Sequence, residues 1–247
     1  MLRDHLSEQL DHDPHFRWRG QAVTRIENLS DIVFALALSM LVSASDVPEN
    51  WTELNAHLIN IIPVTLGFAL LLSIWHSHFT FFRRYGVADR FIVFLNAILL
   101  LVILFIAYPL RFIFDGLFAY VLGAVNGDWS RMAKLGLIEA GHAATIMAYF
   151  TIGYTVIFIL TSSMYTHAMR NADRLKLSPA ERIITRRSIW RYRIEIGLGI
   201  LATVCALFTF LGPFAGFLLS LNILAAAIVN LILKLPPAEE NEEPSPT

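Results

Sequence analysis

The chain has 247 residues, of which 56% are hydrophobic and only 16% charged, whereas ordinary soluble domains carry about 25% charged residues. This composition and a mean hydropathy of +0.58 exclude a typical soluble enzyme and a disordered chain. A formal net charge of −1 provides no overall field that would attract nucleic acid, and a single cysteine excludes an intrachain disulfide and a cysteine-rich metal site.

Long stretches without charge are the main pattern of the sequence, and they predict membrane spans. A helix of about 20 apolar residues crosses the hydrocarbon core of a bilayer. Charged residues are absent from 91–110, 140–169 and 196–233, and the last stretch is long enough for two crossings separated by a turn at Gly212-Pro213. We predict an all-α, polytopic membrane protein with six transmembrane helices, at residues 25–46, 57–82, 90–112, 138–167, 189–211 and 214–234.

The distribution of basic residues predicts the orientation of these spans. Sixteen of the 19 Lys and Arg lie in the N-terminal tail, the second and fourth loops and the C-terminal end. The positive-inside rule then places both termini in the cytoplasm, as an even number of spans also requires. Three regions follow: a cytoplasmic N-terminal tail (1–24), a six-helix transmembrane domain (25–235) and a disordered acidic C-terminal tail (236–247).

Two connections between the spans are also predicted. Residues 113–136 form a long outer loop with several glycines. Ser178, Pro179 and Glu181 are typical of a helix N-terminus, with a cap, a first-position proline and a first-turn acid. A cytoplasmic helix is therefore expected to start there and to run into the fifth span.

The sequence contains no pattern typical of an enzyme or of a fixed metal site. Glu139 and His142 have the Glu-x-x-His spacing of di-iron bundles, but such a site needs a second copy and two further glutamates. His76 and His78 are two residues apart, so they face different sides of a helix and do not chelate one metal. A Gly-rich phosphate loop and a nucleophile elbow are also absent. We expect no enzymatic activity, no cofactor and no fixed metal ion.

Polar residues cluster at the cytoplasmic ends of the first three predicted spans. Asp31 lies about 9 Å along the helix from Arg25, at about 1.5 Å per residue, and a carboxylate there needs partners. The candidates are Arg25, Trp75, His76, His78 and Asn96. We interpret the cluster as a buried polar network that holds the helices together. The alternative is a proton relay, because ionisable residues within spans often mark ion pathways.

Leu36, Ser39, Met40 and Ser43 share one face of the first predicted span, because they recur at helical spacing. Small hydroxyl side chains on this face allow close packing of helices. The same face also suits a pore lining with bulky constrictions and a layer of hydroxyl groups. Periodicity alone leaves both interpretations open.

Residues 25–31, Arg-Ile-Glu-Asn-Leu-Ser-Asp, resemble the Arg-x-x-x-Phe-Ser-Asp signature of the endosomal and lysosomal potassium channel family, named for transmembrane protein 175. Leu29 stands where the signature has phenylalanine. Residues 32–41 resemble the first span of that family. The next two spans are similar through Trp75, His76, His78 and Phe81, and through Asn96, a run of leucines and Pro109.

The resemblance implies a homotetramer of six-span subunits in a prokaryotic cytoplasmic membrane, with the first helix of each subunit lining a central pore that lacks a carbonyl filter. The constriction rings would be Leu36, Met40 and Ser43, and the hydroxyl selectivity layer would be Ser39. Met40 and Ser43 depart from the aliphatic residues usual there. The signature network would comprise Arg25, Ser30, Asp31, Trp75, His76, His78 and Asn96.

The expected function is therefore a potassium-permeable cation channel. Its partners would be permeating monovalent cations, the lipid bilayer and three further copies of the chain, without nucleic acid. One alternative is a proton-coupled transporter or proton-conducting channel that uses Asp31 and the histidines of the second span. Another is a membrane enzyme or a non-transporting scaffold. A transporter requires a mid-membrane site built from broken helices and charge, and we expect no formal charge at mid-membrane, which favours the channel.

Overall fold

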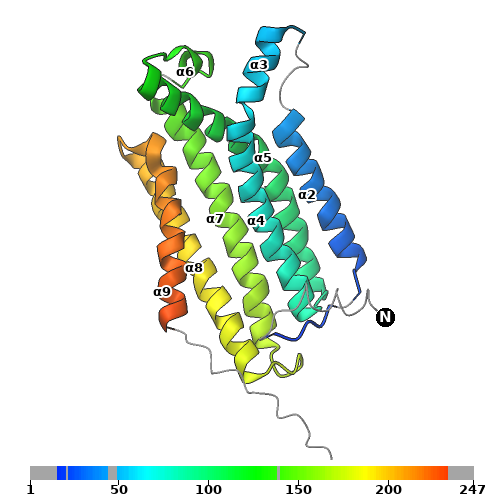
Figure 1. Ribbon diagram of the computed structural model, residues 1–247. Coiled ribbons are helices and arrows are strands. Elements are labelled where there is room, and N and C mark those ends of the chain that lie inside the picture. The colour runs from blue at the N-terminus through cyan, green and yellow to red at the C-terminus, as the bar shows by residue number, and fades with distance from the viewer. Residues whose placement is uncertain (1–15, 21, 44–48, 138–139, 233–247) are drawn as a thin grey trace, which may run out of the picture.

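The computed structural model describes residues 16–20, 22–43, 49–137 and 140–232, and every regular element within these ranges is a helix (Figure 1). The all-helical prediction is confirmed for this part of the chain. In order, the elements are α2 (Arg25–Ser43), α3 (Trp51–Ile59), α4 (Ile61–Tyr85), α5 (Arg90–Asn126), α6 (Ser130–Lys134), α7 (Ala140–Arg170), α8 (Pro179–Phe208), the 3-10 helix η1 (Gly212–Leu221) and α9 (Asn222–Ile232). The predicted tail at 236–247 lies outside the described residues.

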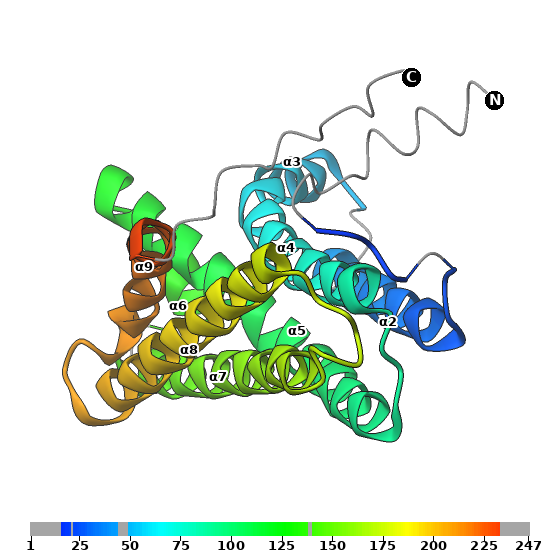
Figure 2. The same cartoon turned by 90° about the horizontal axis from the view of Figure 1, so that it is seen from below.

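The long helices run side by side in one bundle. Helix α5 packs against α2 and α4 on one side and against α7 on the other, while α7 packs against α8 and η1. Figure 2 shows this arrangement from below, with α2 and α4 at one side of the bundle and α8 and α9 at the other. Helix α2 begins at the lower end in Figure 1, and α3 and α6 lie at the opposite, upper end.

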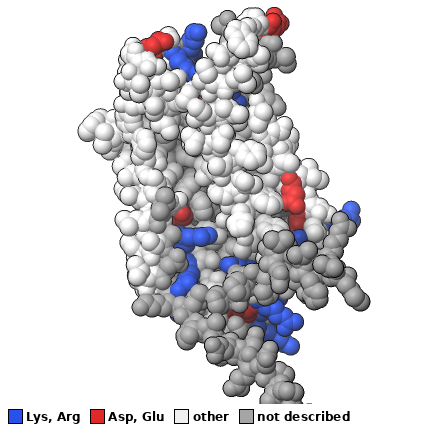
Figure 3. Space-filling view, viewed as in Figure 1, with Lys and Arg blue, Asp and Glu red and all other residues white. Residues whose placement is uncertain are grey.

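Among the residues that the structure describes, three helices are long and apolar enough to cross a membrane, at Ile61–Tyr85, Arg90–Asn126 and Gly141–Arg170. They coincide with the predicted second, third and fourth spans, so the membrane-spanning character of the chain is confirmed. The first, fifth and sixth spans stay predictions. Figure 3 shows Lys and Arg side chains gathered toward the lower end of the bundle, where α2 begins.

The predicted outer loop at 113–136 is wrong over its first half, because α5 continues as a helix to Asn126. Arg111, just before this extension, forms an ion pair with Asp115, one turn later, at 2.9 Å, and such i, i+4 pairs support a helix. Gly123 lets the Trp129 ring pack on the helix, since a Cβ there would lie 2.6 Å from the ring. The helix ends at Gly127, whose φ of +71° is a left-handed conformation favoured by glycine.

The region around the fifth and sixth predicted spans agrees only in part. Helix α8 begins with Ser178 and Glu181 in a capping box and with Pro179 in its first turn, which confirms the predicted helix start. Helix α8 ends at Phe208, shortly before the turn that was predicted at Gly212-Pro213. The following segment is not one α-helix, however: it is 3-10 over η1 and becomes α-helical only at α9.

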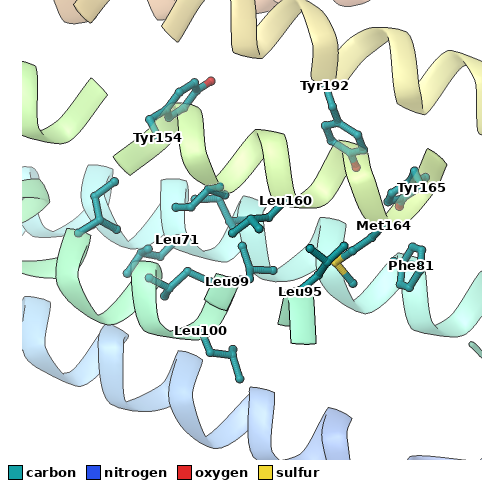
Figure 4. Close-up of a cluster of buried hydrophobic side chains, with 14 of the residues drawn as sticks. Leu71, Phe81, Leu95, Leu99, Leu100, Tyr154, Leu160, Met164, Tyr165 and Tyr192 are labelled. Carbon is teal, nitrogen blue, oxygen red and sulfur yellow. The ribbon is translucent and has the colours of Figure 1, made fainter. Parts of the chain in front are cut away.

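The core lies between α4, α5, α7 and α8. Figure 4 shows part of it, where leucines of α4 and α5 meet Leu160, Met164 and Tyr165 of α7. At the lower end, the ring of Tyr165 packs at 5.2 Å from Phe81, 5.5 Å from Tyr85 and 5.1 Å from Tyr192. Buried aromatic pairs of this kind contribute about 0.5–1.5 kcal/mol each beyond their area. They hold α4, α7 and α8 together at the end where α2 starts.

Candidate functional site

Helix α2 has one buried face and one exposed face. Ser30, Phe34, Ala37 and Leu41 recur every three or four residues and are all buried, facing α4 and α5, the helices that α2 contacts. The opposite face is apolar but exposed, and its side chains include Leu29, Ile32, Leu36 and Val42, each more than half exposed. An apolar helix face of this kind faces lipid, another subunit or a pore.

The predicted pore residues do not all lie on the exposed face. Leu36 is 52% exposed and Ser39 is also exposed, so these two lie together on the uncovered side of α2. Met40 is partly buried and packs against the core. Ser43 is the last residue of α2, but its side chain lies outside the described part of the structure.

A buried chain of hydrogen bonds connects α2, α5 and α4. The Asn96 amide on α5 is only 2% exposed and donates through Nδ2 to Ser30 Oγ at 3.0 Å. Its Oδ1 accepts from His78 Nε2 at 2.7 Å, and Ser30 Oγ donates to the Ile26 carbonyl at 2.8 Å. Asn96 therefore joins three helices at one point, with both ends of its amide in use.

Asp31 takes no part in this buried chain. Its side chain is exposed, and its Oδ1 accepts from the Trp75 indole at 2.8 Å. The side chains of Arg25 and His76 are also exposed, and neither forms a hydrogen bond or an ion pair with another residue that the structure describes. The expected network therefore divides into a buried Ser30–Asn96–His78 chain and a separate Asp31–Trp75 pair.

Two further contacts fix the start of α2, and the sequence analysis missed both. Thr24 and Glu27 form a reciprocal cap, in which the Glu27 amide donates to Thr24 Oγ1 at 3.3 Å and the Thr24 amide donates to Glu27 Oε1 at 3.1 Å. Glu27 is buried and its carboxylate lies 3.4 Å from Arg83 of α4. The Thr-x-x-Glu spacing is the sequence signal of such a cap.

The residues that precede α2 are bound to the rest of the bundle. The amides of Arg19 and Gly20 donate to the Arg83 carbonyl at 3.0 Å, and the Arg19 guanidinium pairs with Glu181 of α8 at 2.7 Å. Burial opposes ionisation of Glu181, but hydrogen bonds from the Arg19 side chain and from the backbone amides of Ser178 and Arg17 outweigh it and hold the pKa of this carboxyl below its ordinary value. The connection to α2 is thus held between α4 and α8.

Arg111 of α5 binds the other end of α2. It is buried and donates through Nη1 to the carbonyl oxygen of Leu41, and through Nε to Asp115 at 2.9 Å. The last carbonyls of a helix have no partner within the helix, and a cation there also interacts favourably with the helix dipole. Both ends of α2 are therefore fixed by charged side chains of the neighbouring helices.

Comparisons with known proteins show which family the chain belongs to. Residues 25–107 match the family model described as endosomal/lysosomal potassium channel TMEM175. A protein of Marivirga tractuosa named as a potassium channel is 33% identical over 211 residues, which cover 84% of each chain. The chain belongs to the TMEM175 family. A Chamaesiphon minutus potassium channel is 26% identical over 72% of this chain and 81% of its own length.

Solved structures of the TMEM175 family have the same fold. The crystal structure of a variant of the potassium channel MtTMEM175, bound to a nanobody fusion, has a TM-score of 0.77 and 32% identity, over 90% of this chain and 97% of the other. A TMEM175 homologue from Chamaesiphon minutus has a TM-score of 0.55 at 22% identity, over 83% and 97%. Because the relatives are named as channels, the family is one of ion channels and not of enzymes.

The region matched by the TMEM175 family model, 25–107, contains α2, α4 and the first half of α5. All residues of the buried Ser30–Asn96–His78 chain and of the Asp31–Trp75 pair fall within it. The resemblance read from residues 25–31 is therefore confirmed at the level of the family, and the substitution of Leu29 for phenylalanine is compatible with membership. Leu29 itself lies on the exposed face of α2.

One ionisable residue, Glu195, lies inside the bundle, and the sequence analysis did not single it out. Glu195 is the seventeenth residue of α8, and its carboxylate accepts from the hydroxyl of Tyr154, near the middle of α7, at 2.6 Å. Glu195 is 7% exposed, and the side chain of Asn222 also bonds to it. Glu195 therefore brings an ionisable group into the predicted fifth span, inside the bundle.

Proposed function

We propose that this chain is a potassium-permeable cation channel whose pore is lined by the exposed face of α2 from four subunits. The observation that carries the proposal is the position of Leu36 and Ser39. Both lie on the side of α2 that the described part of the chain leaves uncovered. The helix that bears them belongs to a family whose relatives are named potassium channels.

The proposed chemistry of the pore follows from these two side chains. Leu36 from each subunit would form an apolar ring that opposes hydration, and such constrictions gate by losing water. The Ser39 hydroxyls, one turn further along, would replace part of the water shell of an ion. Met40 and Ser43 would form the remaining rings, with Met40 turning partly toward the core. A pore without fixed charge or a carbonyl filter is expected to select only modestly among monovalent cations.

The topology that goes with this pore has six spans and both termini in the cytoplasm of a prokaryote. The start of α2, the end of α4, the end of α7 and the start of α8 lie at one end of the bundle and carry most of the basic residues. That distribution supports placing this end in the cytoplasm. The upper end, with α3 and α6, would then face the outside of the cytoplasmic membrane.

The chain is expected to form a homotetramer with four-fold symmetry. One subunit offers a single helix with a pore-type face, and cyclic symmetry closes four of them into a ring. Native mass spectrometry in mild detergent should show four chains as the main species. A monomer that is stable in lipid nanodiscs and still conducts would contradict this arrangement.

The function is tested by ion flux into liposomes that contain the purified protein, with potassium and sodium gradients compared. Ser39→Trp should block the flux, since four indoles would fill the proposed pore. Ser73→Trp is the matched control, because Ser73 is an exposed serine of another membrane helix, α4. Equal flux from both variants would place the pore elsewhere, and proton flux without potassium flux would support the proton-coupled alternative.

A further inference from the structure

The bundle contains a large apolar cavity that the proposed pore does not use. Its volume is about 730 Å³, within the range of about 300–1,000 Å³ typical of small-molecule sites. It lies between the second half of α5, the first half of α7 and η1, with α6 over one end; the helices α5, α6 and α7 are labelled in Figure 1. The described residues that line it include none from α2, so the cavity is separate from the exposed face of that helix.

The lining of this cavity is suited to hydrocarbon and not to water. The described residues that line it include no charged side chain, and Phe112, Phe150 and Phe217 are typical of them. Two of its polar side chains are already hydrogen-bonded: the Tyr154 hydroxyl donates to Glu195 at 2.6 Å, and Ser220 Oγ donates to the Phe217 carbonyl at 2.6 Å. A buried water needs two to four polar partners, and these two hydroxyls have already used their donors.

The end of the cavity beneath α6 has the chemistry of a membrane interface. Trp129 and Tyr120 both line it, with their rings in edge contact at 5.7 Å, and such aromatic residues concentrate at headgroup level. Met132 of α6 also lines the cavity, and the same short helix carries Arg131 and Lys134. Arg131 stacks on Phe118, whereas Lys134 is exposed. A cation beside an apolar cavity complements the phosphate of a lipid.

We propose that this cavity holds an acyl chain of a glycerophospholipid, whose phosphate lies beside Lys134. The chain enters past Trp129 and Tyr120 and reaches toward Tyr154 and Asn222, which line the inner end. The lipid belongs to the leaflet that α6 faces. It contacts α5, the helix that carries Asn96 and Arg111, but it does not contact the ion pathway.

The proposal is tested by native mass spectrometry of the full-length protein extracted in mild detergent. The unaltered protein should keep adducts with the mass of a phospholipid. Ala143 lines the cavity, so Ala143→Trp should lower adduct occupancy about tenfold or more, as a loss of about 1.4 kcal/mol in binding would do. Ala124→Trp is the matched control, because Ala124 is exposed on α5 and does not line the cavity; it should keep the adducts.

Lys134 provides a second arm that separates the two parts of the lipid. Lys134→Gln should reduce the phospholipid adduct by a smaller factor than Ala143→Trp, because the acyl chain still binds. Adducts with the mass of a free fatty acid, in place of a phospholipid, would overturn the choice of ligand. Adducts of equal occupancy in Ala143→Trp and Ala124→Trp would overturn the site itself.

Two further measurements keep the test decisive. If Ala143→Trp does not fold, Ala143→Leu replaces it, with thermal unfolding followed in the same detergent. In the unaltered protein, phospholipids with brominated acyl chains should quench the fluorescence of Trp129, read as the difference from Trp129→Phe. If the brominated lipids leave this fluorescence difference unchanged, the proposal is contradicted. If the unaltered protein carries no adduct and Ala143→Trp breaks up the oligomer, a second copy of the chain covers the cavity and the proposal is wrong.

Discussion

Leu36→Ala should raise cation flux about tenfold or more, which corresponds to a barrier lower by about 1.4 kcal/mol. Four leucines that converge on the axis of the proposed pore would exclude water, since an apolar neck offers an ion no polar contact. The alanine removes most of each side chain, and four-fold symmetry multiplies the change. Discrimination between potassium and sodium should fall at the same time. Flux into liposomes under opposed gradients measures both quantities.

A buried residue of the same helix serves as the control for this effect. Leu36 is 52% exposed, whereas Phe34, two residues earlier, is 1% exposed. Phe34→Ala should destabilise the fold by about 3–5 kcal/mol without opening a pore, while Leu36→Ala should leave the thermal midpoint of the single subunit nearly unchanged. Greater destabilisation by Leu36→Ala than by Phe34→Ala would mean that Leu36 is a packing residue.

Ser39→Ala should act differently from Leu36→Ala. It removes four hydroxyl oxygens and widens the pore little, so selectivity should fall while total flux changes less. Cysteines placed at 36 and 39, in a chain whose native Cys205 is replaced by alanine, should react with thiol reagents in the open channel. Cysteines at Leu38 and Leu41 should be protected, because Leu41 is buried and Leu38 packs against the core. The reverse pattern would mean that the other face of α2 lines the pore.

The features that the sequence predicted well are those determined by local chemistry. The charge-free stretches 91–110 and 140–169 located the apolar helices α5 and α7, and the predicted second span coincides with α4, because crossing a bilayer requires a run of apolar residues whatever the packing. Ser178 and Glu181 predicted the start of α8 for a similar reason, since a cap depends on residues only three positions apart. The family signature at 25–31 lies within one helical segment.

The features that were wrong depend on packing between distant segments. Glycines at 116 and 123 favoured a loop. In the structure each leaves room on the helix surface for a side chain of a later segment: Leu137 packs at Gly116, and Trp129 packs at Gly123. Spacing also placed Asp31 in one network with Asn96. Adjacent residues on a helix point about 100° apart, so Ser30 faces α5 while Asp31 faces outward to Trp75. Only the rotation of α2 on its neighbours decides which of the two is buried.

Asn96→Ala should destabilise the protein much more than Asp31→Ala does. Asn96 has a hydrogen bond at each end of its amide, to Ser30 and to His78, and alanine leaves both partners buried with one bond fewer. A buried polar group without its partner costs about 1–3 kcal/mol, so the loss over the two partners is about 2–6 kcal/mol. Asp31→Ala removes one exposed hydrogen bond to Trp75, which contributes about 1 kcal/mol.

Thermal unfolding in one detergent, with oligomeric state followed by size-exclusion chromatography, compares Asn96→Ala with Asp31→Ala. We expect a large drop in the thermal midpoint for the first and a small one for the second, because Asp31 is exposed in the single subunit. Should Asp31→Ala instead dissociate the oligomer while the subunit stays folded, Asp31 acts in a contact between subunits. Should Asp31→Asn, which keeps an acceptor for Trp75, leave assembly intact but abolish proton-driven flux, the carboxylate carries protons, and the proton-coupled alternative replaces a purely structural role.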